Sequence, residues 1–209
     1  METFAVQPRD TTCHTLLYAA HDAFRRDLDR LAAAAAAGKG RAPYVRAGWD
    51  NLKEQIRLHH GLEDGWLWSR VQRATAGRRA EQAVLEEMRA EHARLGPLIA
   101  AVDAAMAGTG DLPDAVEELR RELGAHLRHE EMNALPLAET VLAEEEWKAA
   151  AAETGRDWGS GTPLFVPWVV DGIAPVERSR VLTALPRSLR NLNRVMWEPR
   201  YRKRRLWSI

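Results

Sequence analysis

Hydrophobic residues recur every three or four positions through most of the first 150 residues, which is the spacing of one buried face of an α-helix. Turns rich in glycine and proline interrupt this pattern. The pattern predicts four long helices, at about residues 11–37 and 43–76, between Gly77 and Gly108, and at about 113–152. Long amphipathic helices joined by short breaks are typical of an up-down-up-down four-helix bundle, so we expect an all-α fold.

The pattern changes after Gly155, where an apolar segment at 164–170 is followed by two shorter helix-like stretches. This part of the chain has too few regularly spaced apolar residues to form a core of its own. We therefore divide the chain into a bundle, residues 11–152, and a C-terminal helical extension, residues 153–209, that packs on the bundle.

Histidine and glutamate occupy core positions in the predicted helices. Every helix has a histidine on its apolar stripe, and two helices add a glutamate four residues later: His21, His59, Glu63, His92, His126 and Glu130. Residues four apart lie about 40° apart around the helix axis and about 6 Å along it, so both side chains of a pair point into the same space. Burying these polar groups is costly unless a charged or hydrogen-bonding partner meets them, and a metal ion would do so.

Antiparallel packing can bring the histidines and glutamates of the four apolar stripes to one level of the bundle. Imidazole binds iron, zinc, copper and nickel, whereas carboxylates favour harder ions and can bridge a pair of ions. Four imidazoles and two carboxylates therefore predict a site for two transition-metal ions. We expect iron first, with zinc or manganese as alternatives. A single histidine on an apolar face is more often a hydrogen-bonded core residue, and it is the recurrence in four helices that favours a metal.

Other polar residues near the stripes receive different interpretations. His60 and Asp64 lie about 100° away from the stripe of the second helix, so we expect them to support the ligands from outside or to lie at the surface. His14 lies about 10 Å along the helix from the first-helix ligand, too far to bind the same ion. Glu131 flanks the stripe of the fourth helix and would be the substitute ligand if that helix were rotated.

The combined pattern resembles the hemerythrin-type, or HHE cation-binding, domain over about residues 11–152. The resemblance implies two non-haem irons, one bound by His21 and His59 and the other by His92 and His126, with Glu63 and Glu130 as bridges. Met88 departs from the family pattern, because animal oxygen-carrying hemerythrins have a second histidine at this position. One iron then loses a nitrogen ligand unless another donor such as Glu91 replaces it, and a more open iron favours redox chemistry over reversible oxygen storage.

Composition and charge narrow the remaining possibilities. The chain has 30 basic and 30 acidic residues, so its net charge of +0 does not favour a polyanionic partner. Cys13 is the only cysteine, which rules out an intramolecular disulfide and favours a reducing compartment. No leader and no run of about 18 apolar residues is present, so we expect a cytoplasmic protein without a transmembrane segment.

These observations predict a non-haem di-iron protein that binds or reduces oxygen, nitric oxide or peroxide, in sensing or in the response to oxidative or nitrosative stress. We assign no catalytic residue, because no separate acid, base or organic-cofactor motif can be named, and the redox partner is unknown. One alternative is iron storage or donation for the repair of iron centres. Another is a metal-stabilised regulatory module whose basic C-terminal tail binds a partner.

The tail interleaves Trp197, Tyr201 and Trp207 with arginines, a composition that can meet nucleic acid or an anionic membrane. We expect the aromatic residues to dock on the bundle instead, and we do not expect a nucleic-acid partner.

Overall fold

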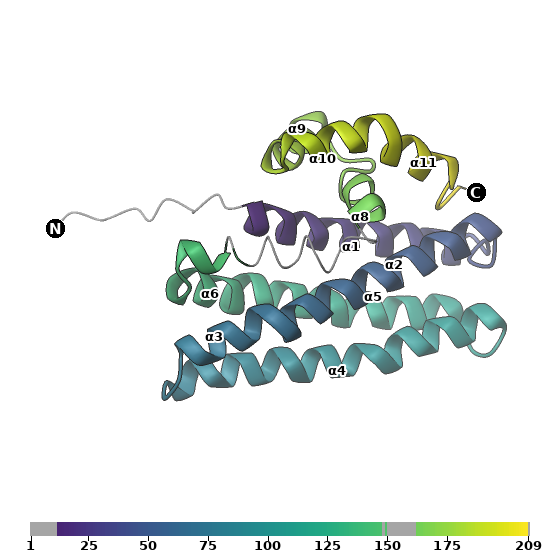
Figure 1. Ribbon diagram of the computed structural model, residues 1–209. Helices are drawn as coiled ribbons and strands as arrows, with labels where there is room; N and C mark the ends of the chain where they lie inside the picture. Colours follow the sequence, from purple (N-terminus) through teal and green to yellow (C-terminus); the bar gives the residue numbers. More distant parts are fainter. Residues whose placement is uncertain (1–11, 148, 150–161, 209) are drawn as a thin grey trace.

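The computed structural model describes residues 12–147, 149 and 162–208, and all regular structure within them is helical (Figure 1). This confirms the all-α prediction. The bundle is formed by α1 (Thr12–Ala36), α2 (Pro43–Leu62), η1 (Glu63–Leu67), α3 (Trp68–Ala74), α4 (Arg79–Ala107), α5 (Leu112–His129), η2 (Glu130–Ala134) and α6 (Leu135–Val141). The predicted boundary between residues 152 and 153 lies outside the described residues.

The helix ends follow from local chemistry that is visible in the sequence. Pro43 is the first residue of α2, where its fixed φ suits a helix and its missing N–H costs no hydrogen bond. Gly108 ends α4 with φ +109°, a left-handed conformation that glycine adopts without steric cost. The Asp111 side chain accepts a hydrogen bond from the Asp114 backbone N–H and caps α5. These signals explain why the predicted turns were correct.

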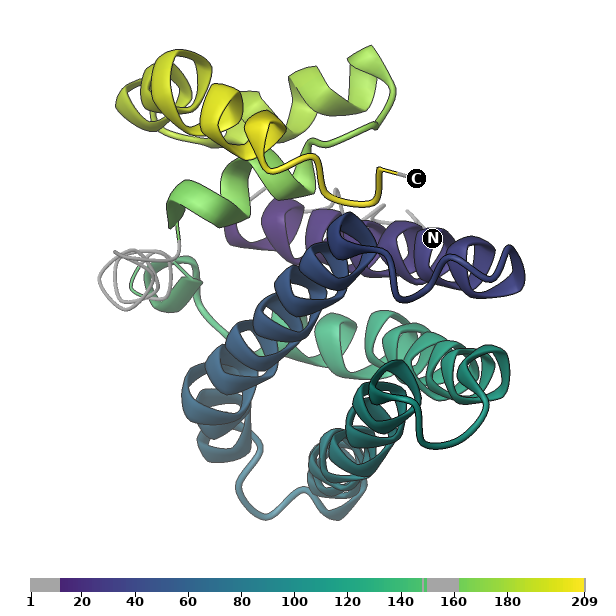
Figure 2. The ribbon, with the colours of Figure 1, turned by 90° about the vertical axis from the view of Figure 1, so that its right-hand side faces the viewer.

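The core of the bundle consists of two separate apolar clusters. One contains Phe24, Trp49 and Leu119, and the other contains Trp68 and Met88. α1 packs against α2 and α5, and α5 packs against α4 (Figure 2). The predicted metal-binding residues belong to neither cluster and lie between them along each helix.

Two of the predicted helices are interrupted by a π-helical turn. The second helix continues from α2 through η1 into α3, and the fourth continues from α5 through η2 into α6. A π turn shifts the hydrogen-bond register by one residue. Pro136 lies just beyond η2, and this shift lets the helix continue past a residue that has no backbone N–H to donate.

The prediction that the fourth helix runs on to about residue 152 was wrong. α6 ends at Val141, where Leu142 adopts an extended conformation with φ −93° and ψ 135°. The side chain of Glu146 then accepts a hydrogen bond from the Ala143 backbone N–H, as at the start of a new helical turn. This change of direction brings Leu142 and Trp147 into the second apolar cluster, and their burial accounts for the break.

The C-terminal residues form a further layer on the bundle. α8 (Thr162–Val169) and α9 (Pro175–Ala184) lie against α1, and α10 (Arg187–Leu192), η3 (Asn193–Trp197) and α11 (Glu198–Lys203) complete the layer (Figure 1). Phe165 and Trp168 join the apolar cluster that contains Phe24. These residues thus share a core with the bundle.

The aromatic residues of the basic tail dock on the bundle, as predicted. Tyr201 is buried in the first apolar cluster, and Trp197 and Trp207 pack against it. Trp207 lies on Gly48 of α2 so closely that a Cβ atom at residue 48 would be 2.4 Å from its ring. The Trp207 backbone N–H also donates to the Tyr44 carbonyl oxygen.

A buried carboxylate, Asp27, holds α8 on α1. Asp27 is fully buried, and its Oδ2 accepts a hydrogen bond from the Trp168 indole N–H at 2.8 Å. Its Oδ1 accepts from Arg26 and Arg30 at 2.9 and 3.0 Å. The buried negative charge is therefore matched by two guanidinium groups and one neutral donor.

We expect Asp27→Ala to lower the free energy of unfolding by about 3 kcal/mol or more, because it leaves buried donors of Arg26 and Trp168 unpaired. Urea denaturation measures the change. Asp29→Ala on the same helix is the matched control, since Asp29 makes an exposed ion pair with Arg120 and should change stability by less than about 1 kcal/mol. Equal effects of both substitutions would contradict the anchoring role of Asp27.

Candidate metal centre

The six predicted ligands meet in one layer of the bundle. The donor atoms of His21, His59, Glu63 and Glu130 all lie within 4.8 Å of one another. His92 and His126 form a second group of the same kind, together with His60. All seven side chains come from α1, α2, α4 and α5 or from the first residue of a π turn.

The two glutamates lie between the two groups of histidines. Glu63 Oε1 is 2.7 Å from His59 Nε2, and Glu63 Oε2 is 3.5 Å from His92 Nε2. Glu130 Oε2 is 3.3 Å from His21 Nε2 and 3.8 Å from His126 Nε2. Each carboxylate therefore reaches a histidine of both groups, which is the placement that a bridging ligand requires.

Three histidines donate their outer N–H group to a carboxylate. His21 Nδ1 is 2.8 Å from Glu131 Oε1, His92 Nδ1 is 3.0 Å from Asp64 Oδ2, and His126 Nδ1 is 2.9 Å from Glu91 Oε2. Because an ionised carboxylate can only accept, the Nδ1 atoms carry the protons. In neutral imidazoles this leaves the Nε2 lone pairs pointing inward, and it is how metal-binding histidines are usually held.

The inward nitrogen atoms face each other in pairs. His21 Nε2 and His59 Nε2 are 3.0 Å apart, and His92 Nε2 and His126 Nε2 are 3.2 Å apart. Two facing acceptors repel each other unless a proton or a metal ion lies between them. Burial is the main effect that lowers the pKa of His126, which disfavours a proton between His92 and His126. Burial also lowers the pKa of His59, so a proton between His59 and His21 would belong to His21.

The carboxylates are in an equally unusual electrostatic situation. Both oxygens of Glu63 and both of Glu130 are buried and have no hydrogen bond of acceptable geometry. Burial, and then the Glu130 carboxylate, raise the pKa of Glu63 well above its usual value. For His21 burial opposes the charge, but Glu130 and Glu131 outweigh it and raise the pKa to about 9. Unpaired carboxylate oxygens beside inward imidazoles fit a divalent cation.

Of the two positions expected for His60, outside the ligands or at the surface, the surface position was wrong. His60 is 9% exposed, and its ring stacks on that of His92 with centroids 4.0 Å apart. Its Nε2 atom is buried without a hydrogen-bond partner. The inward face of α2 is wide enough to include both His59 and His60. Two features of the sequence pointed to His60 as a possible ligand. Met88 lacks the histidine of the family pattern, and His60 directly follows the predicted ligand His59 on another helix.

Neither residue considered as a substitute ligand joins the two groups. Glu131 accepts hydrogen bonds from His21 and Arg25, and Glu91 accepts from His126 and His129. Both act as outer carboxylates that orient the histidines. His14 lies outside the groups, as predicted, and pairs with Glu139.

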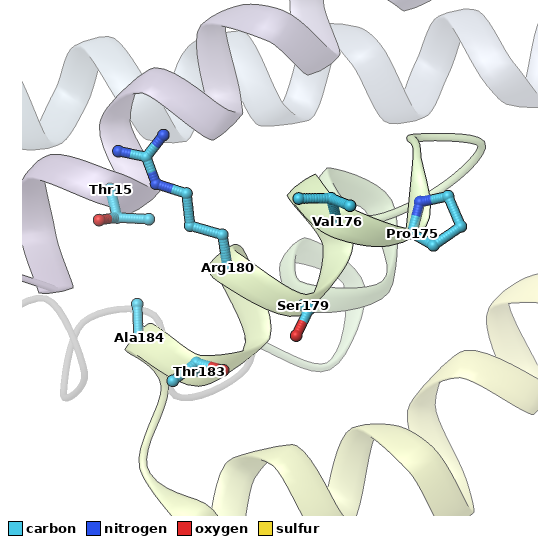
Figure 3. A pocket seen from close by; sticks show the side chains of 7 residues that line it. All are labelled: Thr15, Pro175, Val176, Ser179, Arg180, Thr183 and Ala184. Carbon is cyan, nitrogen blue, oxygen red and sulfur yellow. The ribbon is translucent and has the colours of Figure 1, made fainter.

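A groove of about 780 Å³ between α2 and α4 reaches this layer from the surface. His60 and His92 line it together with Asp64, and Ala93 and Gly96 form part of the α4 wall. Another hollow of about 760 Å³ lies between α1 and α9 (Figure 3), but its only ionisable lining residue is Arg180. The groove between α2 and α4 therefore gives access to two of the histidines.

In the described part of the chain, no helix has the length and apolar character needed to cross a membrane.

Comparisons with known proteins agree with this geometry. No curated protein and no solved structure matches the chain. The family model of the hemerythrin HHE cation binding domain matches residues 14–138, which is more than half of the chain and includes all seven clustered side chains. The chain therefore belongs to the hemerythrin HHE cation-binding domain family and is a metal-binding protein.

Proposed function

We propose that this protein is a cytoplasmic di-iron protein whose centre is held by seven side chains. His21 and His59 would bind one iron, His60, His92 and His126 the other, and Glu63 and Glu130 would bridge them. The observation that carries the proposal is the pair of carboxylates whose unpaired oxygens lie between two sets of inward-facing imidazole nitrogens. Mixed nitrogen and oxygen donors with bridging carboxylates suit iron better than zinc.

His60 would replace the nitrogen donor that Met88 lacks. The Met88 side chain is fully buried in the second apolar cluster and cannot offer an imidazole. With His60 counted, one iron would have three histidines and the other two, besides the shared carboxylates. This unequal supply of donors leaves room for a small exogenous ligand.

The groove supports a small uncharged ligand over a large anion. Its charged lining residues balance, with Lys53, Arg57 and Arg89 against Asp50, Glu54 and Asp64. The neutral form of His60 at its inner end is favoured, because burial and the neighbouring His92 lower the pKa of this histidine. We therefore propose that oxygen, nitric oxide or hydrogen peroxide is bound or reduced here, in sensing or in a stress response.

Two iron ions, when bound, supply two one-electron couples, and reduction of peroxide to water consumes two electrons. The protein's own residues would hold the ions, keep the histidines oriented through the outer carboxylates and limit the entry of water to the groove. A redox partner would have to return the electrons.

A second candidate function is a regulatory module stabilised by its metal. The Phe24 ring contacts His59 on one side and Trp168 on the other, with centroid distances of 5.1 and 5.2 Å. The C-terminal layer is thus one side chain away from a proposed ligand. If metal loss changes the protease sensitivity of residues 162–208 while no ligand or peroxide response is found, this second function is the better one.

We expect Glu63→Ala and Glu130→Ala to lose iron from both positions, because each removes a bridge. His60→Ala should lose about half of the iron, since it affects only one position. Iron per chain after anaerobic purification measures these changes, and His14→Ala is the control that should keep its iron. A His60→Ala protein with full iron content would contradict the assignment of His60.

The outer carboxylates should also matter for metal affinity. We expect Glu91→Gln to weaken metal binding about 10- to 100-fold, because it alters the hydrogen bond that orients His126. Competition with a chelator measures the affinity. Glu87 lies on α4 like Glu91, and its exposed carboxylate is near His129 of α5. Glu87→Gln should change the metal affinity little.

Blocking the groove should slow the ligand without removing the metal. Gly96→Trp can be accommodated, since no atom lies within 4 Å of a Cβ at this position, and the indole would then fill the groove. We expect slower spectral changes with peroxide or azide in stopped-flow experiments and unchanged iron content. Ala100→Trp, exposed on the same helix outside the groove, is the control. Unchanged rates in Gly96→Trp would mean that the ligand enters elsewhere.

A further inference from the structure

A hollow of about 340 Å³ in the C-terminal layer is lined by an unusual number of arginines. It lies between α9 and the segment formed by α10 and η3. Four of its lining residues are arginines: Arg178, Arg187, Arg190 and Arg194. Its volume is at the lower end of the range of about 300–1,000 Å³ that is typical of small-molecule sites.

The positive charge of this arginine pocket is not balanced by the protein. Glu198 is the only carboxylate in the lining, and it already pairs with Arg178 and Arg202, each at 2.5 Å. Within the described residues, the three other arginines of the pocket have no carboxylate within ion-pair distance. Gathering three such guanidinium groups at one hollow is unfavourable unless an anion joins them.

Several arginines on the bundle surface do have carboxylate partners. Arg25 pairs with Glu131, Arg57 with Glu54, and Arg120 with Asp29. The chain as a whole has equal numbers of basic and acidic residues. The surplus charge at the arginine pocket is therefore a local property and does not follow from the composition of the whole protein.

A buried amide in the same pocket narrows the chemistry of the anion. Asn193 is 1% exposed, and its Oδ1 atom has no hydrogen-bond partner. An unpaired buried acceptor calls for a donor, which neither a carboxylate nor sulfate can supply at neutral pH. The inorganic phosphate dianion retains one proton at neutral pH and supplies both functions, because its oxygens accept from guanidinium groups and its P–OH group donates to Asn193. A phosphate monoester loses this proton at about pH 6.

We propose that the arginine pocket binds inorganic phosphate. Guanidinium groups bind phosphate oxygens in a planar, bidentate manner and remain charged at all physiological pH values. The aromatic residues of the tail are docked on the bundle, so they do not offer a stacking surface for the base of a nucleotide. The arginine pocket is separate from the proposed iron centre. If the pocket does not bind phosphate, the proposal of an iron centre is unaffected.

Isothermal titration calorimetry of the full-length, iron-loaded protein tests the proposal, with inorganic phosphate, glycerol 3-phosphate and sulfate as probes. We expect saturable binding of inorganic phosphate and at least tenfold weaker binding of sulfate and of glycerol 3-phosphate, because neither of these two retains a proton to donate at neutral pH. Arg190→Gln and Arg194→Gln should each weaken phosphate binding about tenfold, because each removes a charge-assisted hydrogen bond. Arg200→Gln, an exposed arginine of α11 outside the pocket, is the matched control and should bind phosphate as the unmodified protein does.

Several results would overturn the proposal. The first is that the unmodified protein shows no saturable phosphate binding. The second is that Arg200→Gln weakens phosphate binding as much as the pocket variants do. The third is that phosphate binding persists in both pocket variants and therefore belongs to the iron centre. Vesicles containing phosphatidic acid distinguish the source of the phosphate. Binding to vesicles without binding of soluble phosphates would replace the small-molecule site with a lipid surface. Circular dichroism and iron content check that each variant is folded.

Discussion

The structure depends on a layer of buried carboxylates and imidazoles that interrupts the apolar core. This layer separates the two hydrophobic clusters, so the bundle cannot gain stability there from apolar burial. The unpaired oxygens of Glu63 and Glu130 are costly in the absence of a counter-charge. A bundle of this kind is stable when a cation occupies the layer, so the same residues that would carry function also make folding and metal binding interdependent.

The geometry of the layer is set by its surroundings as much as by the ligands. Glu63 and Glu130 are each the first residue of a π-helical turn, at which the helix register shifts directly after the His-x-x-x-Glu pair. Carboxylates from other turns of the bundle then hold the outer nitrogens of three histidines, among them Asp64 for His92 and Glu91 for His126. These constraints keep imidazoles that would otherwise rotate pointing inward.

The sequence predicted the parts of this arrangement that depend on a single helix. Turn residues and apolar periodicity located the helices, and a polar residue on an apolar stripe identified each of the six predicted side chains that meet in the layer. What it missed depends on how two helices lie relative to each other. Whether His60 reaches the layer is decided by the width of the inward face of α2, and whether Glu91 binds a metal or a histidine is decided by its distance from α5. The π turns leave no periodic signal, and the end of α6 follows from the burial of Leu142.

The C-terminal layer covers one side of the bundle and leaves the groove beside α4 open. On α1, three residues at successive turns face different partners: His21 the metal layer, Phe24 both His59 and Trp168, and Asp27 the indole of Trp168. α8 to α11 thus cover the α1 side, whereas α4 lies on the opposite side of the bundle in both views (Figures 1 and 2). A ligand that reaches the groove between α2 and α4 therefore approaches from the side that the C-terminal layer leaves open, and the second histidine group is the first to meet it.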